Sequence, residues 1–145
     1  MSARENIAKN LIEQLTNMTD PAPGLVSRKY FDVTKLAITQ FPAILLITSN
    51  ESRQDISTDL REGNIQYQLR CYLRGTELDT LRNELIERIE ETIETDRSRN
   101  IEYNINNIHN VTTRVANIEL ITRELPLAEV VVNVDVFYRY KKGVL

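Results

Sequence analysis

The sequence predicts an α+β fold, an antiparallel or mixed sheet with one covered side and two main helices. Two stretches carry apolar residues at helical spacing, and several others have strand patterns. The clearest strand, Ile65–Arg74, alternates apolar and polar residues, so one face of the sheet is buried and the other is wet. With 145 residues, the chain has the size of one domain, residues 1–145, and is long enough to bury a core.

The first expected element is a helix from about Ala3 to Met18. Ser2 and Glu5 form a capping-box pattern at its start, and Asp20–Gly24, with two prolines and a glycine, ends it. The apolar residues at helical spacing are Ile7, Leu11, Ile12, Leu15 and Met18. A short amphipathic helix is marginal alone and needs a surface to pack on.

Two strands are expected next. Leu25–Asp32 is a plausible strand, and Leu36–Thr48 is more apolar but contains Pro42. The proline indicates either an edge strand or a strand that begins at Ala43. Ser49–Gly63 is polar almost throughout and is expected to be a loop, or a loop with a short helical turn. Connections of this length are unusual in a small domain and are often functional.

The strand Ile65–Arg74 should end at Gly75 and lead into a second helix, Glu77–Thr95. The apolar stripe of this helix consists of Leu78, Leu81, Leu85, Ile89 and Ile93. The stripe and the apolar face of the strand are natural packing partners.

The last third of the chain predicts a hairpin. Arg114–Arg123 and Leu127–Tyr140 have strand character, and the turn between them is Arg123–Pro126. The preceding segment, Asn100–Asn110, is rich in asparagine and is expected to be a loop or an irregular strand.

The chain carries few groups suited to catalysis. His109 is the only histidine, which excludes a two-histidine metal site within one chain. Cys71, the only cysteine, lies on the apolar face of its strand and is expected to be an inert buried thiol. The four glycines are isolated and make no phosphate-binding loop. We therefore expect no enzyme, no catalytic or metal site and no cofactor.

The termini and the apolar runs bear on location. The first ten residues are polar and lack the apolar core of a secretory signal, which predicts synthesis in the cytoplasm. No apolar run approaches the roughly 20 residues that span a bilayer, so no membrane partner is expected.

The net charge of −3 is unevenly distributed, because residues 77–96 contain eight acidic residues and two arginines, a local charge of −6. Four glutamates stand close together on the second helix: Glu87, Glu90, Glu91 and Glu94. Three interpretations are open for them: carboxylate pairs that bind a cation, a solvated outer face, or the wall of a channel in an oligomer. Like-charged walls would keep DNA from sticking, so DNA would be only a passing cargo.

The layout resembles the tail terminator (tail completion, head–tail joining) proteins of long-tailed bacteriophages. The likeness lies in a short first helix, the Pro42–Ile47 stretch, a polar segment with Glu51, one alternating strand and one long helix. It ends in the hairpin sequence Val-Asn-Val-Asp-Val-Phe-Tyr-Arg-Tyr, residues 132–140. The resemblance implies a mixed, largely antiparallel sheet with two main helices packed on one face.

It also implies a function in the virion, at the tail–neck junction, after synthesis in the host cytoplasm. A homo-oligomer, a hexameric ring, would cap the tail tube, end its polymerisation and join the tail to the neck and head. The expected partners are the tail tube protein and, beyond it, sheath and neck or connector proteins. Contacts between subunits or with the tube are expected in Ser49–Gly63 and Arg97–Asn110. The candidate assembly-interface residues are Glu51, Arg53, Asp55, Arg97, Arg99 and Tyr103.

Three other classes stay open. Another head–tail connector or neck protein would share the fold type and the place in the virion. A nucleic-acid-binding module would use the basic and aromatic residues after the second helix and at 138–142, since such residues stack bases. A small enzyme would need a deep pocket with several titratable groups.

Overall fold

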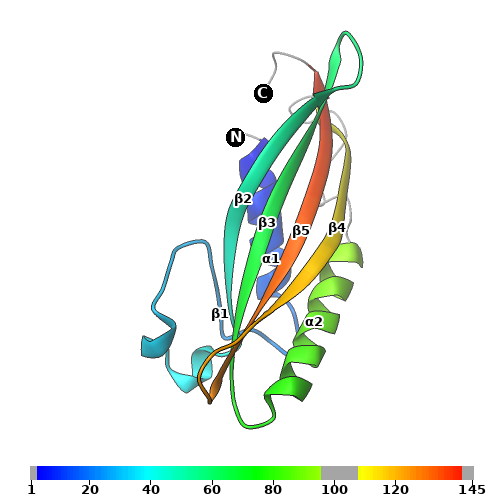
Figure 1. The fold of residues 1–145 in the computed structure, drawn as a ribbon. Coiled ribbons are helices and arrows are strands. Elements are labelled where there is room, and N and C mark those ends of the chain that lie inside the picture. Colours follow the sequence, from blue (N-terminus) through cyan, green and yellow to red (C-terminus); the bar gives the residue numbers. More distant parts are fainter. Residues whose placement is uncertain (1–2, 96–107, 142–145) are drawn as a thin grey trace.

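The structure, a computed structural model, describes residues 3–95 and 108–141 (Figure 1). In these ranges it contains two helices, α1 (Ala3–Thr16) and α2 (Leu78–Thr95). The strands are β1 (Leu25–Ser27), β2 (Ala43–Asp55), β3 (Leu60–Arg74), β4 (Ile108–Ile121) and β5 (Leu127–Lys141). They form one five-stranded sheet in the order β1-β2-β3-β5-β4, in which β1 and β2 are parallel and every other pair is antiparallel. The predicted α+β fold with a mixed, largely antiparallel sheet is confirmed.

Both helices pack on the same face of the sheet (Figure 1). The alternation in β3 and β5 places every second residue on this face, opposite an apolar partner such as Leu69 with Val132. The helices contribute the fully buried residues Ile7, Leu11, Leu15, Leu85, Ile89 and Ile93. Burial of each such side chain contributes on the order of 1.5–3 kcal/mol before entropy is subtracted. Helix α1 ends two residues before the predicted Met18, and α2 begins one residue after the predicted Glu77.

Within the described residues, the opposite face of the sheet is covered at one end by residues 28–42, where Val33, Ala43, Leu45 and Tyr72 form a second apolar cluster. The predicted strand Leu25–Asp32 is wrong beyond Ser27, because the chain leaves the sheet there to lay Phe31 against the ring of Tyr72, with centroids 5.7 Å apart. The Asp32 carboxylate then accepts a hydrogen bond from the amide of Thr34 at 3.0 Å and starts a short 3-10 helix, η1 (Val33–Lys35). This cap explains why the strand does not continue.

A second 3-10 helix, η2 (Ile38–Gln40), replaces the first half of the predicted strand Leu36–Thr48. The Gln40 side chain accepts a hydrogen bond from the amide of Ala37 at 2.8 Å and closes this turn. Strand β2 then begins at Ala43, which was one of the two readings that Pro42 allowed.

The predicted loop Ser49–Gly63 is wrong, because β2 and β3 continue through almost all of it as a hairpin. Their pairing runs on from Asn50 opposite Gln66 to Asp55 opposite Arg61, and only Ile56–Asp59 connects the strands. We call residues 50–65 the arm, and Ile56–Asp59 its tip. Figure 1 shows that the tip projects beyond the rest of the sheet.

The hairpin of β4 and β5 is confirmed, with Ile121 opposite Glu129. Strand β4 begins at Ile108, six residues before the predicted Arg114, so residues 108–110 of the asparagine-rich segment belong to the sheet. The rest of that segment lies outside the described residues. The β4–β5 turn lies at the end of the sheet where β3 ends. There the amide of Gly75 donates a hydrogen bond to the carbonyl of Pro126 at 3.1 Å.

Candidate assembly surfaces

A β-bulge in β2 decides which side chains of the arm face the helices. The register shifts between Thr48 and Asn50, and the Ser49 hydroxyl donates to the carbonyl of Gln66 at 3.0 Å. Before the bulge the even-numbered residues of β2, such as Leu46, face the helices, and after it the odd-numbered residues do. The extra residue therefore turns Glu51, Arg53 and Asp55 toward the helix side.

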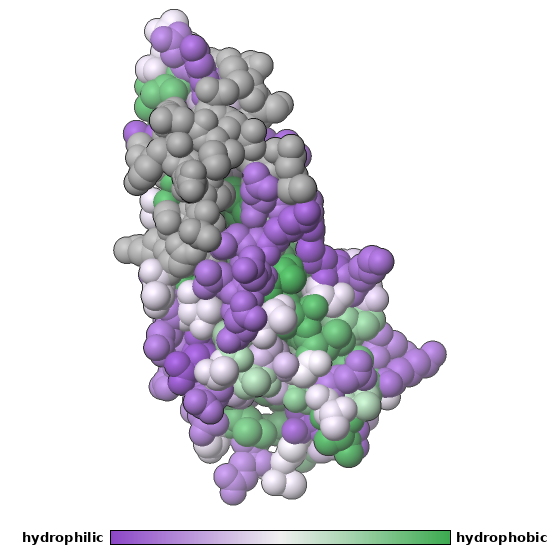
Figure 2. All heavy atoms as spheres, turned by 180° about the vertical axis from the view of Figure 1, so that it is seen from behind, coloured by the Kyte–Doolittle hydropathy of each residue, from purple (hydrophilic) through white to green (hydrophobic). Residues whose placement is uncertain are grey.

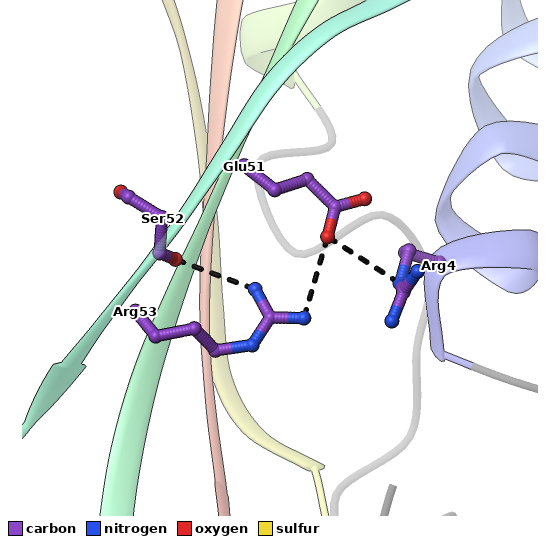
Figure 3. A network of polar contacts seen from close by, with 4 residues as sticks. All are labelled: Arg4, Glu51, Ser52 and Arg53. Carbon is purple, nitrogen blue, oxygen red and sulfur yellow. Dashed lines mark hydrogen bonds and ion pairs between the residues drawn. The ribbon is translucent and has the colours of Figure 1, made fainter.

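Glu51 and Arg53 join the arm to the first turn of α1 (Figure 3). One carboxylate oxygen of Glu51 lies 3.5 Å from Nε of Arg4 and 3.3 Å from Nη2 of Arg53. Arg53 also donates to the carbonyl of Ser52 at 3.4 Å, and its guanidinium lies 5.8 Å from the ring centroid of Tyr140. The two candidate interface residues thus brace the arm within one chain.

Asp55 stands nearer the tip and is more accessible than Glu51 and Arg53. Its carboxylate accepts a hydrogen bond from Nε of Arg61 at 3.0 Å, on the opposite strand, and its side chain is 61% exposed. For Glu51 the exposed fraction is 22%. Of the three predicted interface residues that the structure describes, Asp55 is therefore the most exposed. Arg97, Arg99 and Tyr103 lie outside the described residues.

The acidic residues of α2 point away from the core. Glu87, Glu91 and Glu94 are exposed and Glu90 is partly exposed, while Leu85, Ile89 and Ile93 on the other side of the helix are buried. Arg88 stands among them, with Nη1 3.1 Å from a carboxylate oxygen of Glu91. In residues 3–95 and 108–141, no group of three or more His, Cys, Asp or Glu side chains is arranged to hold a metal ion. The geometry fits a solvated face or the wall of a wide channel.

The open face of the sheet carries a series of ion pairs between strands, which the sequence analysis did not predict. Arg114 of β4 pairs with Asp135 of β5 at 3.3 Å, and Arg139 of β5 pairs with Glu62 of β3 at 3.3 Å. At the covered end of this face, Glu129 of β5 is almost fully buried and accepts a hydrogen bond from Nε of Arg123, in the β4–β5 turn, at 2.6 Å. The polar alternation of β5 signals a wet face, but these partners are known only once the register is known.

The thiol of Cys71 lies in the core. Burial raises its pKa, because the thiolate would lose its hydration, and the nearby charge of Glu129 acts in the same direction. The Sγ atom contacts the carbonyl of Leu69 at 3.6 Å. The expectation of a buried thiol is confirmed.

In the part of the chain that the structure describes, no helix is long and apolar enough to cross a membrane.

The two ends of the sheet differ in their surface. At the end opposite the tip, several large apolar side chains are exposed: Tyr30 by 80%, Ile38 by 71%, Leu120 by 60%, Ile121 by 40% and Leu125 by 82%. Figure 2 shows hydrophobic surface in the lower half of the molecule, toward this end. We call it the apolar end. The sequence does not indicate this end, because its residues come from separate segments.

Two pockets open at the apolar end. One, of about 180 Å³, is lined by Pro21, Ile38, Phe41, Pro42, Leu73, Arg74 and Leu81. We call it the end pocket. The other, of about 290 Å³, lies beside the β4–β5 hairpin and includes Leu120, Ile121 and Leu125.

Compared with models of known protein families and with curated proteins, the chain matches none. The fold and the surfaces define a small α+β protein with one helix-covered sheet face, a projecting arm and an apolar end.

Proposed function

We propose that this chain is a structural virion protein, a tail terminator of a long-tailed bacteriophage. Copies of it form a ring that caps the tail tube, ends the polymerisation of the tube and joins the tail to the neck. The observation that carries the proposal most directly is the arm, a braced β-hairpin with a projecting tip, in the segment where inter-subunit or tube contacts were expected.

The edges of the sheet support assembly. Strand β1 pairs only with Ala43–Leu45, so in the described part of the chain the outer edge of β2 has no strand partner from Leu46 onward. Strand β4 forms the other edge of the sheet. Long edges with free backbone groups are suited to contacts with other chains. A contact between the edge of β2 in one copy and the edge of β4 in the next would be head-to-tail, and head-to-tail contacts form a ring when the rotation between copies closes.

The acidic face of α2 fits the same function. A ring that joins tail to head must let DNA pass without holding it. Exposed carboxylates on the wall of such a channel repel phosphate groups, and this repulsion weakens as salt screens it. The basic side chains of the open sheet face are matched by acidic partners in the pairs Arg114–Asp135 and Arg139–Glu62. This pairing does not favour a nucleic-acid-binding surface.

The proposal is tested by adding the purified full-length protein to growing tail tubes and measuring tube lengths by electron microscopy. A terminator shortens the length distribution and appears as a cap at one end of each tube. Bovine serum albumin at the same concentration controls for crowding. Native mass, measured in parallel, should show a ring of six copies on its own or on the tube ends. Tubes that grow unchanged and carry no cap would refute the proposal, and binding to the portal instead would identify a neck protein.

A further inference from the structure

The tip of the arm carries one exposed apolar side chain. Ile56 is 41% exposed, and it is the only large exposed hydrophobic residue in the described part of the chain that lies at this end of the molecule. Three hydrogen bonds hold the turn around it. The amides of Ile56 and Ser57 donate to the carbonyl of Leu60 at 3.0 and 3.2 Å, and the amide of Leu60 donates to Oγ of Ser57 at 3.2 Å. The tip is therefore pre-shaped, which lowers the entropy cost of docking it.

The end pocket is the apolar site at the opposite end of the sheet. Six of its seven lining residues are apolar, and the seventh is Arg74. The β-strand leading to the tip begins at this end, since β2 starts at Ala43, directly after the lining residue Pro42. The tip and the end pocket are thus separated by the length of the sheet and cannot meet within one chain.

We propose that the tip of one copy inserts Ile56 into the end pocket of the next copy. This inference rests on the proposed function and names the contact that links the subunits of the ring. The tip and pocket are different surfaces of the same chain, so the contact is head-to-tail. When the isoleucine side chain lies between Pro42, Leu73 and Leu81, both its own apolar surface and that of the pocket are removed from water.

The charges match the same orientation. Asp59, the last residue of the tip, is exposed, and Arg74 is an exposed residue on the lining of the end pocket. Asp55, just before the tip, adds a second carboxylate, which Arg61 already accompanies at 3.0 Å. An acidic tip is attracted to a pocket whose one charged lining residue is a cation. We therefore assign Asp59 as the partner of Arg74 in the next copy.

The test is the self-association of the full-length protein, followed by native mass spectrometry and light scattering over a range of concentrations. Ile56→Asp should weaken association by roughly 10- to 150-fold, the loss expected for one buried aliphatic side chain. The matched control is Thr58→Asp, which adds the same charge to another exposed tip residue and should weaken association much less. Thermal unfolding of each variant confirms that the fold is intact, as expected for substitutions in an exposed turn.

Charge exchange tests the orientation. Asp59→Arg and Arg74→Asp should each weaken association, and the double variant should restore it, because the pair is then reversed. Leu125→Asp, at the apolar end but outside the end pocket, should leave association unchanged. The inference is overturned if the wild-type protein stays monomeric at every concentration, if Ile56→Asp assembles like the wild type, or if the double variant is weaker than both single ones.

The results of these experiments can be distinguished from the result of the test of the proposed function, which measures tube length. Tubes capped normally by an Ile56→Asp ring would overturn the tip contact and leave the terminator function standing. A ring that depends on Ile56 but never caps tubes would support the tip contact and refute the function.

Discussion

At the scale of single residues, Gly63 has no room for a side chain. A Cβ atom placed there would lie 2.5 Å from Cζ and 2.7 Å from Cε1 of Tyr138, a fully buried residue. Gly63→Ala should therefore lower the free energy of unfolding by about 1–3 kcal/mol, the usual cost of overpacking a core. The gain of about 0.5–1 kcal/mol from replacing a glycine within a strand is too small to offset this. Urea denaturation followed by circular dichroism measures the difference.

Gly75 provides the matched control for this substitution. A Cβ atom at Gly75 would meet Cδ1 of Leu81 at 3.0 Å, and this atom is the end of a flexible side chain. Gly75→Ala should change stability by less than about 1 kcal/mol. A loss of less than about 1 kcal/mol in both variants would show that the ring of Tyr138 moves aside easily, which contradicts the close packing of the arm against β5.

At the scale of elements, the sequence predicts those helices and strands that pack against the core. Helices α1 and α2 and strands β3 and β5 each place apolar residues at a regular spacing, because one side of each lies on the core. The arm lacks this signal. Its helix-side residues do not pack into the core: Glu51 pairs with Arg4 at the start of α1, and Arg53 pairs with Glu51. The bulge at Ser49 also reverses which alternate residues face the helices, so the sequence of this polar strand was interpreted as a loop.

The acidic face of α2 allows a prediction at this scale. Changing Glu87, Glu90, Glu91 and Glu94 together to glutamine should alter the free energy of unfolding by less than about 1 kcal/mol. The loss of the Arg88–Glu91 pair, about 0.3–0.5 kcal/mol, is offset by relief of like-charge repulsion between residues four apart, about 0.2–0.5 kcal/mol per pair. The assembled variant ring should retain DNA at low salt and release it as salt rises.

The control for this variant changes charge equally elsewhere. Glu13, Glu77, Glu119 and Glu124 are exposed, and their change to glutamine gives the same net charge. That ring should not retain DNA. If both rings retain DNA to the same extent, net charge alone explains the effect, and the acidic face of α2 does not line the channel.

At the scale of the whole molecule, the apolar end lay beyond what the sequence predicts. Ile38 comes from a 3-10 helix, Leu120 from the end of β4 and Leu125 from the β4–β5 turn. Each is a single exposed apolar residue in its own segment, which is ordinary for a soluble protein. Only the sheet brings these segments to one end, where together they form the kind of patch that marks an interaction site. The candidate interface in the arm, by contrast, was proposed for one continuous segment because of its length and polarity, and it stays a prediction.

Part of the apolar end should remain accessible for binding another protein after the tips have filled the end pockets, because Leu125 lies outside the end pocket and is 82% exposed. Leu125→Asp should therefore keep the native mass of the ring and weaken its binding to one axial partner, the tail tube or the neck, by roughly 10- to 150-fold. Binding to the other partner should not change. Co-sedimentation with tubes and with neck proteins measures both affinities, and Thr58→Asp at the tip is the control. Unchanged binding to both partners would mean that the ring docks through its strand edges or its open sheet face, and that the apolar residues beside Leu125 serve no contact along the tail axis.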